Sequence, residues 1–201
     1  MPLSAQLFFR EGFMDELFLT SSIPPSVNHY LSYRAIMKKG KPLAVSYKPK
    51  EVVDYRKSFS KYVELEVEKQ GFDYVHDGRR HFYVDGVFYM PRLDMDANNY
   101  WKVLLDAITD TQLVWKDDNV VCERVNAIYY DPLNPRVEIH IYPTDYIGIF
   151  ESQDALDVFV ETCKNCTRYK RNCSVLRKAE EGRIQEEICD GVCNKYKEKK
   201  D

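Results

Sequence analysis

Apolar residues recur at helical spacing in two segments of the chain. Between Glu51 and Gln70 they form one stripe, and Gly71 follows as a residue that commonly ends helices. A second stripe runs from Ala97 to Ile108, where an aromatic residue is followed by aliphatic residues three, four and seven positions on. Both segments are predicted to be helices that pack one face against a core.

Alternating apolar and polar residues predict strands elsewhere. In the segment 81–90 the large apolar residues share one side, and Asp77-Gly78 marks a turn before it. Helices mixed with hairpin-like strands indicate an α+β sheet domain, which we place at residues 1–145. The other predicted strands are residues 16–20, 119–130 and 137–142.

A polar loop follows the first predicted strand, because Pro24-Pro25 stops regular structure. After this loop, the basic segment Lys38–Pro49 is predicted to be flexible and to lie over a nucleic-acid surface. The loop itself carries groups suited to contacting a ligand, namely Asn28, His29, Tyr30 and Arg34.

Acidic residues stand at both ends of the helix predicted from Ala97 to Ile108. If the alternation of the preceding strand continued past residue 90, the side chains of Arg92, Asp94, Asp96 and Asn98 would point to one side. Carboxylates gathered in one place repel each other unless they share a proton or a divalent cation. The residues concerned are Asp94, Asp96 and Asn98 at the entrance and Asp117 and Asp118 at the exit.

Oxygen donors without a nearby His or Cys favour a hard metal such as Mg²⁺, which needs few protein ligands because it keeps several waters. Lys102 lies one helical turn after Asn98, where it is suited to hold a phosphate or to stabilise a leaving oxygen. In the alternative interpretation, the acidic residues only complement a helix start and form a turn before a strand.

Net charge alone does not favour nucleic-acid binding, because the 201 residues carry a formal charge of −3. Lysine and arginine are nevertheless gathered between Lys38 and Lys50, at Arg79-Arg80 and in the last forty residues. Such patches can follow a phosphate backbone. No segment has the length and hydropathy of a membrane helix or of a signal peptide, so we expect a cytoplasmic protein without membrane contact.

Five of the six cysteines lie between Cys163 and Cys193. In a reducing compartment this crowding indicates metal binding, and Cys163 and Cys166 have the Cys-x-x-Cys spacing of a zinc knuckle. We therefore predict that residues 146–201 form a small helical module that binds one Zn²⁺. The expected ligands are Cys163, Cys166 and Cys173 with Cys193, and Cys189 is an equally suitable fourth ligand.

Three stretches together resemble the RusA-type Holliday junction resolvases: "IPPSVNHYLSYR", "DANNYWKVLLDAIT" and "VWKDDNVV". The family pattern is a PPS-x-N loop, then D-x-D-N-x-x-K-x-x-x-D-A-L, then W-x-D-D, and the likeness covers about residues 18–142. If Lys102 is aligned with the family lysine, Asp96 and Asp118 match metal-binding aspartates, but Asn98 stands where the family has a second aspartate.

The resemblance implies a RusA-like mixed β-sheet with packed helices, in a homodimeric, Mg²⁺-dependent endonuclease that cuts four-way DNA junctions by paired symmetric nicks. Asp96 and Asp118 would bind the metal and Lys102 would position the phosphate or the nucleophile. We expect DNA contacts from Asn28, Arg34, Arg92 and Asn99. The alternative is a non-catalytic nucleic-acid-binding zinc protein, in which Asn98 has disabled the metal site. A third interpretation is a less selective nuclease that acts on flaps or other branched DNA.

Overall fold

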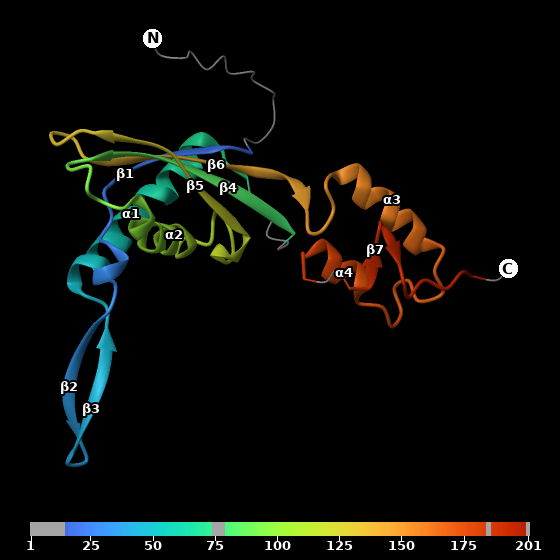
Figure 1. The fold of residues 1–201 in the computed structure, drawn as a ribbon, viewed down its shortest axis with the longest axis horizontal. Coiled ribbons are helices and arrows are strands. Elements are labelled where there is room, and N and C mark those ends of the chain that lie inside the picture. The colour runs from blue at the N-terminus through green and yellow to red at the C-terminus, as the bar shows by residue number, and fades with distance from the viewer. Residues whose placement is uncertain (1–14, 74–78, 184–185, 200–201) are drawn as a thin grey trace, which may run out of the picture.

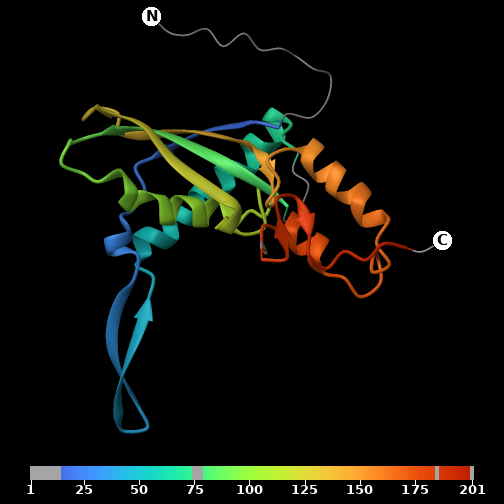
Figure 2. The ribbon, with the colours of Figure 1, turned by 45° about the vertical axis from the view of Figure 1, so that its right-hand side comes forward.

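The computed structural model describes residues 15–73, 79–183 and 186–199 (Figure 1). A four-stranded sheet is covered on one face by two helices, a two-stranded ribbon projects from one end, and a small C-terminal unit lies at the other. The turned view in Figure 2 shows the ribbon standing clear of the rest of the chain. The helices of the described residues include none that is long and apolar enough to cross a membrane.

The sheet is mixed, as predicted, and its strand order is β1-β6-β4-β5. β6 pairs antiparallel with both β1 and β4, whereas β4 and β5 are parallel. The turn predicted at Asp77-Gly78 lies outside the described residues. The four strands are β1 (Leu17–Ser22), β4 (Arg80–Met90), β5 (Val121–Tyr130) and β6 (Arg136–Ile147).

Helix α1 (Lys50–Gln70) confirms the first predicted helix, and Gly71 ends it in the left-handed conformation at φ 63°. Its buried residues Phe59 and Val63 belong to the main core, and Val52 is also buried. Gln70 also exchanges two hydrogen bonds with the backbone of Phe18 in β1. This helix therefore covers the sheet and also hydrogen-bonds backbone groups of its edge strand.

The second predicted helix has two parts, a 3₁₀ turn η2 (Ala97–Tyr100) and helix α2 (Trp101–Thr109). Trp101 packs directly over Gly86 in β4, since a Cβ built at Gly86 would come within 2.6 Å of the Trp101 ring. Phe88, two residues along the same strand face, meets that ring edge-on with 5.4 Å between centroids. This packing fixes α2 on the sheet.

In the part of the chain that the structure describes, no helix covers the other face of the sheet (Figure 1). This face carries a row of aromatic rings. Phe18 stacks on His140 at 4.3 Å, and Tyr142 follows at 4.5 Å from His140. Arg124 lies 3.9 Å above the ring of Tyr83. This face is thus aromatic and half-buried rather than a simple polar surface.

The prediction of a flexible loop at Lys38–Pro49 is wrong. β2 (Ser32–Lys38) and β3 (Lys41–Tyr47) pair antiparallel along their whole length. Lys39 and Gly40, at φ 52° and 73°, form the two-residue turn between them. Positive φ at both positions matches the twist of the flanking strands, so the turn supports the ribbon that we had predicted to be disordered.

The C-terminal unit begins with α3 (Gln153–Lys164), which Ser152 caps by accepting a hydrogen bond from the Ala155 amide at 3.2 Å. The second helix of this unit, α4 (Val175–Glu180), ends before Gly182, which has a left-handed φ of 66°. The strands β7 (Ile188–Cys189) and β8 (Val192–Cys193) follow as a short hairpin.

The contact between Trp101 and Gly86 gives a first prediction. Gly86→Ala should lower the free energy of unfolding by about 1–3 kcal/mol in urea, because the added methyl group overpacks the core against the indole ring. In a Trp101→Leu background the same change should cost clearly less, since the smaller side chain leaves space. An equal cost in both backgrounds would contradict this packing.

Candidate active site

Asp106 in α2 is the centre of the polar network on the helical side of the sheet. One carboxylate oxygen accepts hydrogen bonds from the Tyr30 hydroxyl at 2.5 Å and from Arg56 at 3.2 Å. The other oxygen accepts from Lys102 Nζ at 2.8 Å. Burial acts to raise the pKa of Asp106, but the hydrogen bonds from Lys102 and Tyr30 hold it below its usual range. The carboxylate is therefore ionised at neutral pH.

Lys102 joins this network to the end of the acidic stretch. Its Nζ lies 3.3 Å from Asp118 Oδ2 as well as 2.8 Å from Asp106. The hydrogen bond to Asp106, together with the charge of Asp118, raises the pKa of Lys102. Because the side chain stays protonated and half-exposed, it can offer a positive charge to an anion but cannot act as a base at neutral pH.

Arg56 anchors the network from α1. Its guanidinium forms a two-point ion pair with Asp110, at 2.9 and 2.6 Å, while a third nitrogen reaches Asp106. Tyr30 follows the short 3₁₀ turn η1 (Val27–His29), which lies against η2 and α2. The polar loop and both helices of the sheet domain therefore meet at one carboxylate.

Two of the predicted metal ligands cap local turns. Asp96 Oδ1 accepts from the Asn98 amide at the start of η2, and Asp117 Oδ1 accepts from the Asn119 amide, both at 3.0 Å. Asp117 thereby caps the 3₁₀ turn η3 (Asp118–Val120), which holds Asp118. Of this acidic pair, Asp118 is the residue that reaches Lys102.

The predicted extended phase of the entrance residues is wrong. β4 ends at Met90, residues 91–95 turn, and Asn98 lies in η2, so Asp94, Asp96 and Asn98 do not project together from one strand. Asp94 instead forms an ion pair with Arg92 at 3.0 Å, and their side chains are 72% and 71% exposed, respectively. Proline at position 91 cannot donate to the ladder and ends the strand.

The residues predicted to contact DNA lie on different elements. Asn28 is exposed in η1, and Arg34 is exposed in β2, where it lies 5.5 Å from the centre of the Tyr47 ring. Arg92 is exposed in the turn after β4. Asn99 is half-buried and donates its amide to the Asp96 carbonyl at 3.1 Å.

Within residues 15–73, 79–183 and 186–199, no group of three or more His, Cys, Asp or Glu side chains is arranged to hold a metal ion. A site made only of protein carboxylates is therefore not formed there. The donors near Lys102 are nevertheless oxygens, and Asp118 is about a third exposed at 31%. The carboxylates of Asp96 and Asp118, the amide oxygen of Asn98 and several waters would be the kind of oxygen ligands that Mg²⁺ prefers.

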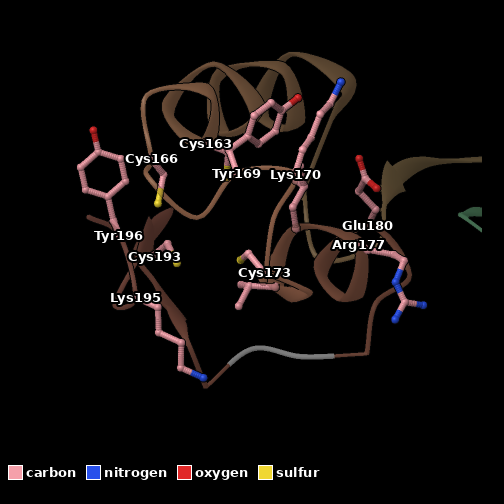
Figure 3. Close-up of a pocket in the computed structure, with 12 residues that line it drawn as sticks. Cys163, Cys166, Tyr169, Lys170, Cys173, Arg177, Glu180, Cys193, Lys195 and Tyr196 are labelled. Atoms are coloured by element: carbon pink, nitrogen blue, oxygen red, sulfur yellow. The ribbon is translucent and has the colours of Figure 1, made fainter. Parts of the chain in front are cut away.

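The cysteines predicted to bind zinc gather in the C-terminal unit. Cys163, Cys166, Cys173 and Cys193 line a cavity of about 200 Å³ (Figure 3). Cys189 is exposed and does not line it. Burial, with the charges of the three other thiols, raises the pKa of Cys163 to about 11. Zinc itself stays a prediction, because the described residues contain no group of three or more such side chains arranged to hold a metal ion.

Sequence reasoning assigned no role to Asp106 or Arg56 and did not place Tyr30 in the network. Asp106 follows Lys102 by four residues, so the helical ion pair could have been found from spacing. Arg56 and Tyr30 lie 50 and 76 residues from Asp106 in the sequence. No local pattern links them to it.

The α+β domain holds a lysine between two carboxylates and carries a basic two-stranded ribbon, and both features suit a ligand that contains phosphate. Residues 23–142, more than half of the chain, match the family described as endodeoxyribonuclease RusA. The chain belongs to this family of endodeoxyribonucleases, which confirms the resemblance found in the sequence. A comparison with curated proteins found no match.

The network around Asp106 predicts a pH-dependent loss of stability. Asp106→Asn should lower the free energy of unfolding by about 2–3 kcal/mol at pH 7, because three donors lose a charged acceptor. The folded-state pKa is depressed, so this contribution is complete above the unfolded value of about 4 and is lost as pH falls through the folded pKa.

Urea unfolding of both proteins at pH 7, 5 and 3 measures this difference. It should be constant between the two higher values and shrink at the lowest. Asp94→Asn is the matched control, because its carboxylate forms only an exposed pair and should matter little at any pH. A difference for Asp106→Asn that does not change with pH would contradict the ionised network.

Proposed function

We propose that this protein is a Mg²⁺-dependent endodeoxyribonuclease that resolves four-way DNA junctions by paired symmetric nicks. The observation that carries the proposal is the position of Lys102 between Asp106 and Asp118, within the segment that matches the nuclease family. The protonated amine is held by one carboxylate and faces another that is partly open to solvent. An incoming phosphate can meet this cation without any prior proton transfer.

Asp96 and Asp118 would hold the metal, with the amide oxygen of Asn98 as a third donor. Once bound, Mg²⁺ would stabilise the charge that develops on a phosphodiester attacked by water. Lys102, which lies 3.3 Å from Asp118, would direct its charge toward the phosphate. Asp106 would keep Lys102 in place, because its other contacts come from Tyr30 and Arg56.

The β2–β3 ribbon supports DNA as the substrate. The chain from Leu17 to Lys50 has six Lys or Arg residues and no Asp or Glu, although the whole protein is slightly acidic. A two-stranded ribbon fits the major groove of B-DNA, where its cations can contact phosphates on both sides. The base of the ribbon is close to the site, since Lys48 Nζ lies 4.8 Å from the centre of the Tyr30 ring.

A homodimer follows from the symmetry of the proposed substrate. A four-way junction has two equivalent cleavage positions, and a two-fold pair of chains would present one site to each. The open sheet face is the surface that we propose for the dimer contact. Its Tyr, Phe and Arg side chains are residue types enriched in protein interfaces.

Cleavage of a labelled four-way junction tests the proposed activity. The wild type should nick opposing strands with Mg²⁺ and not with EDTA, whereas Asp96→Asn and Asp118→Asn should lose cleavage and still bind the junction. Asp157→Asn is the control, because Asp157 is an exposed carboxylate on α3, outside the segment that matches the nuclease family. It should keep most of the activity.

Cleavage that persists in both Asp96→Asn and Asp118→Asn would refute the assignment of the site. Equal cutting of junctions, flaps and duplexes at one salt concentration would instead restrict the protein to a less selective nuclease. An inactive wild type that gains activity through Asn98→Asp would favour the alternative of a disabled, junction-binding protein.

The ribbon gives a separate prediction for binding. Replacing Lys38, Lys39 and Lys41 with Gln should weaken junction affinity and reduce the slope of log affinity against log salt by about 2–3, since three phosphate contacts are lost. A triple Gln variant of Lys61, Lys69 and Lys164, on α1 and α3, has the same charge and should keep the slope. Equal slopes for the ribbon variant and the wild type would exclude the ribbon from the interface.

A further inference from the structure

The C-terminal unit has a very small apolar core. Among its described residues, the buried cluster consists of Phe150, Leu156, Phe159 and Ala179, with the rings of Phe150 and Phe159 5.2 Å apart. A unit of this size rarely buries enough apolar surface to be stable unless a disulfide or a metal holds it together. All of its cysteines are free thiols.

Four of the five thiols of this unit come from separate segments and line one cavity. Figure 3 shows Cys163 and Cys166 at the end of α3 and after it, Cys173 in the following loop, and Cys193 in β8, around the same space. Cys163 and Cys193 also pack against the apolar cluster. The four cysteines therefore bring α3, the loop before α4 and the hairpin around one cavity.

The backbone around two of these cysteines has the form of a ligand turn. The Cys166 amide donates to the Cys163 carbonyl at 2.9 Å, which closes the Cys-x-x-Cys turn. The Lys197 amide donates to Cys166 Sγ at 3.4 Å, and such bonds stabilise a thiolate. On the hairpin, Asp190 and Gly191, at φ 50° and 73°, form the turn that separates Cys189 from Cys193.

We propose that Cys163, Cys166, Cys173 and Cys193 bind one structural Zn²⁺, which draws their sulfurs together and holds the C-terminal unit. Four sulfur donors select zinc or an iron–sulfur centre among biological metals, and zinc needs no redox partner. The cavity also decides between the two late cysteines. Cys193 lines it, whereas the Cys189 sulfur is exposed and accepts from Asn194 Nδ2 at 3.7 Å.

Metal analysis of the full chain, purified with a phosphine reductant and without added metal, tests this site. The wild type should contain about one zinc per chain, and Cys163→Ser and Cys193→Ser should each contain less than a tenth of that. Cys189→Ser is the matched control, since it lies on the same hairpin as Cys193 and should keep about one zinc. Cys122→Ser, in β5, should do the same.

If a Ser variant fails to fold, replacing the bound metal with Co²⁺ still tests the ligand assignment. Wild type and Cys189→Ser, stripped with a chelator and refilled with Co²⁺, should give the same tetrahedral thiolate absorption and regain protection of the C-terminal unit from a protease. Less than a tenth of a zinc per reduced wild-type chain, stoichiometric iron, or loss of the spectrum in Cys189→Ser would each overturn the proposal. Junction cleavage is not the readout, so this result is independent of the proposed nuclease activity.

Discussion

The structure depends on one partly buried carboxylate being kept charged. Asp106 is 13% exposed, and without donors its burial would favour the neutral acid. Tyr30, Arg56 and Lys102 supply those donors from the polar loop, from α1 and from α2 itself. Removing the charge would therefore weaken the contact of three elements at once, and Arg56 and Lys102 would each lose one of their two carboxylate partners.

The same carboxylate links folding to chemistry. Lys102 is positioned by Asp106, and its Nζ also lies 3.3 Å from Asp118 in η3, directly before β5. An enzyme that cuts phosphodiesters needs positive charge in a fixed place before the substrate arrives, because reorganising charges during the reaction costs rate. The packing of Trp101 on Gly86 fixes the first turn of α2, and hence the position of the adjacent lysine.

Local pattern predicted much of this arrangement. The apolar stripe ended by Gly71 gave α1 almost to the residue, and the acidic pair with Lys102 marked the site. The pattern failed where the backbone changes direction. The alternation of β4 predicts an extended strand beyond Met90, where the chain in fact turns. The basic segment around Lys39 and Gly40 predicts a flexible loop, although these two residues form a tight turn. The contacts of Arg56 with Asp106 join distant segments, so periodicity contains no sign of them.

Single-turnover cleavage of a four-way junction by Lys102→Gln would test the central claim most directly. Glutamine keeps most of the length and the hydrogen-bonding ability of the side chain but removes its charge. The account predicts that cleavage slows by about 10²–10³-fold while junction affinity changes little, because the cation acts on the charge that develops in the transition state. A variant that cleaves as fast as the wild type would show that Lys102, and the carboxylate network that holds it, is not the cleavage centre.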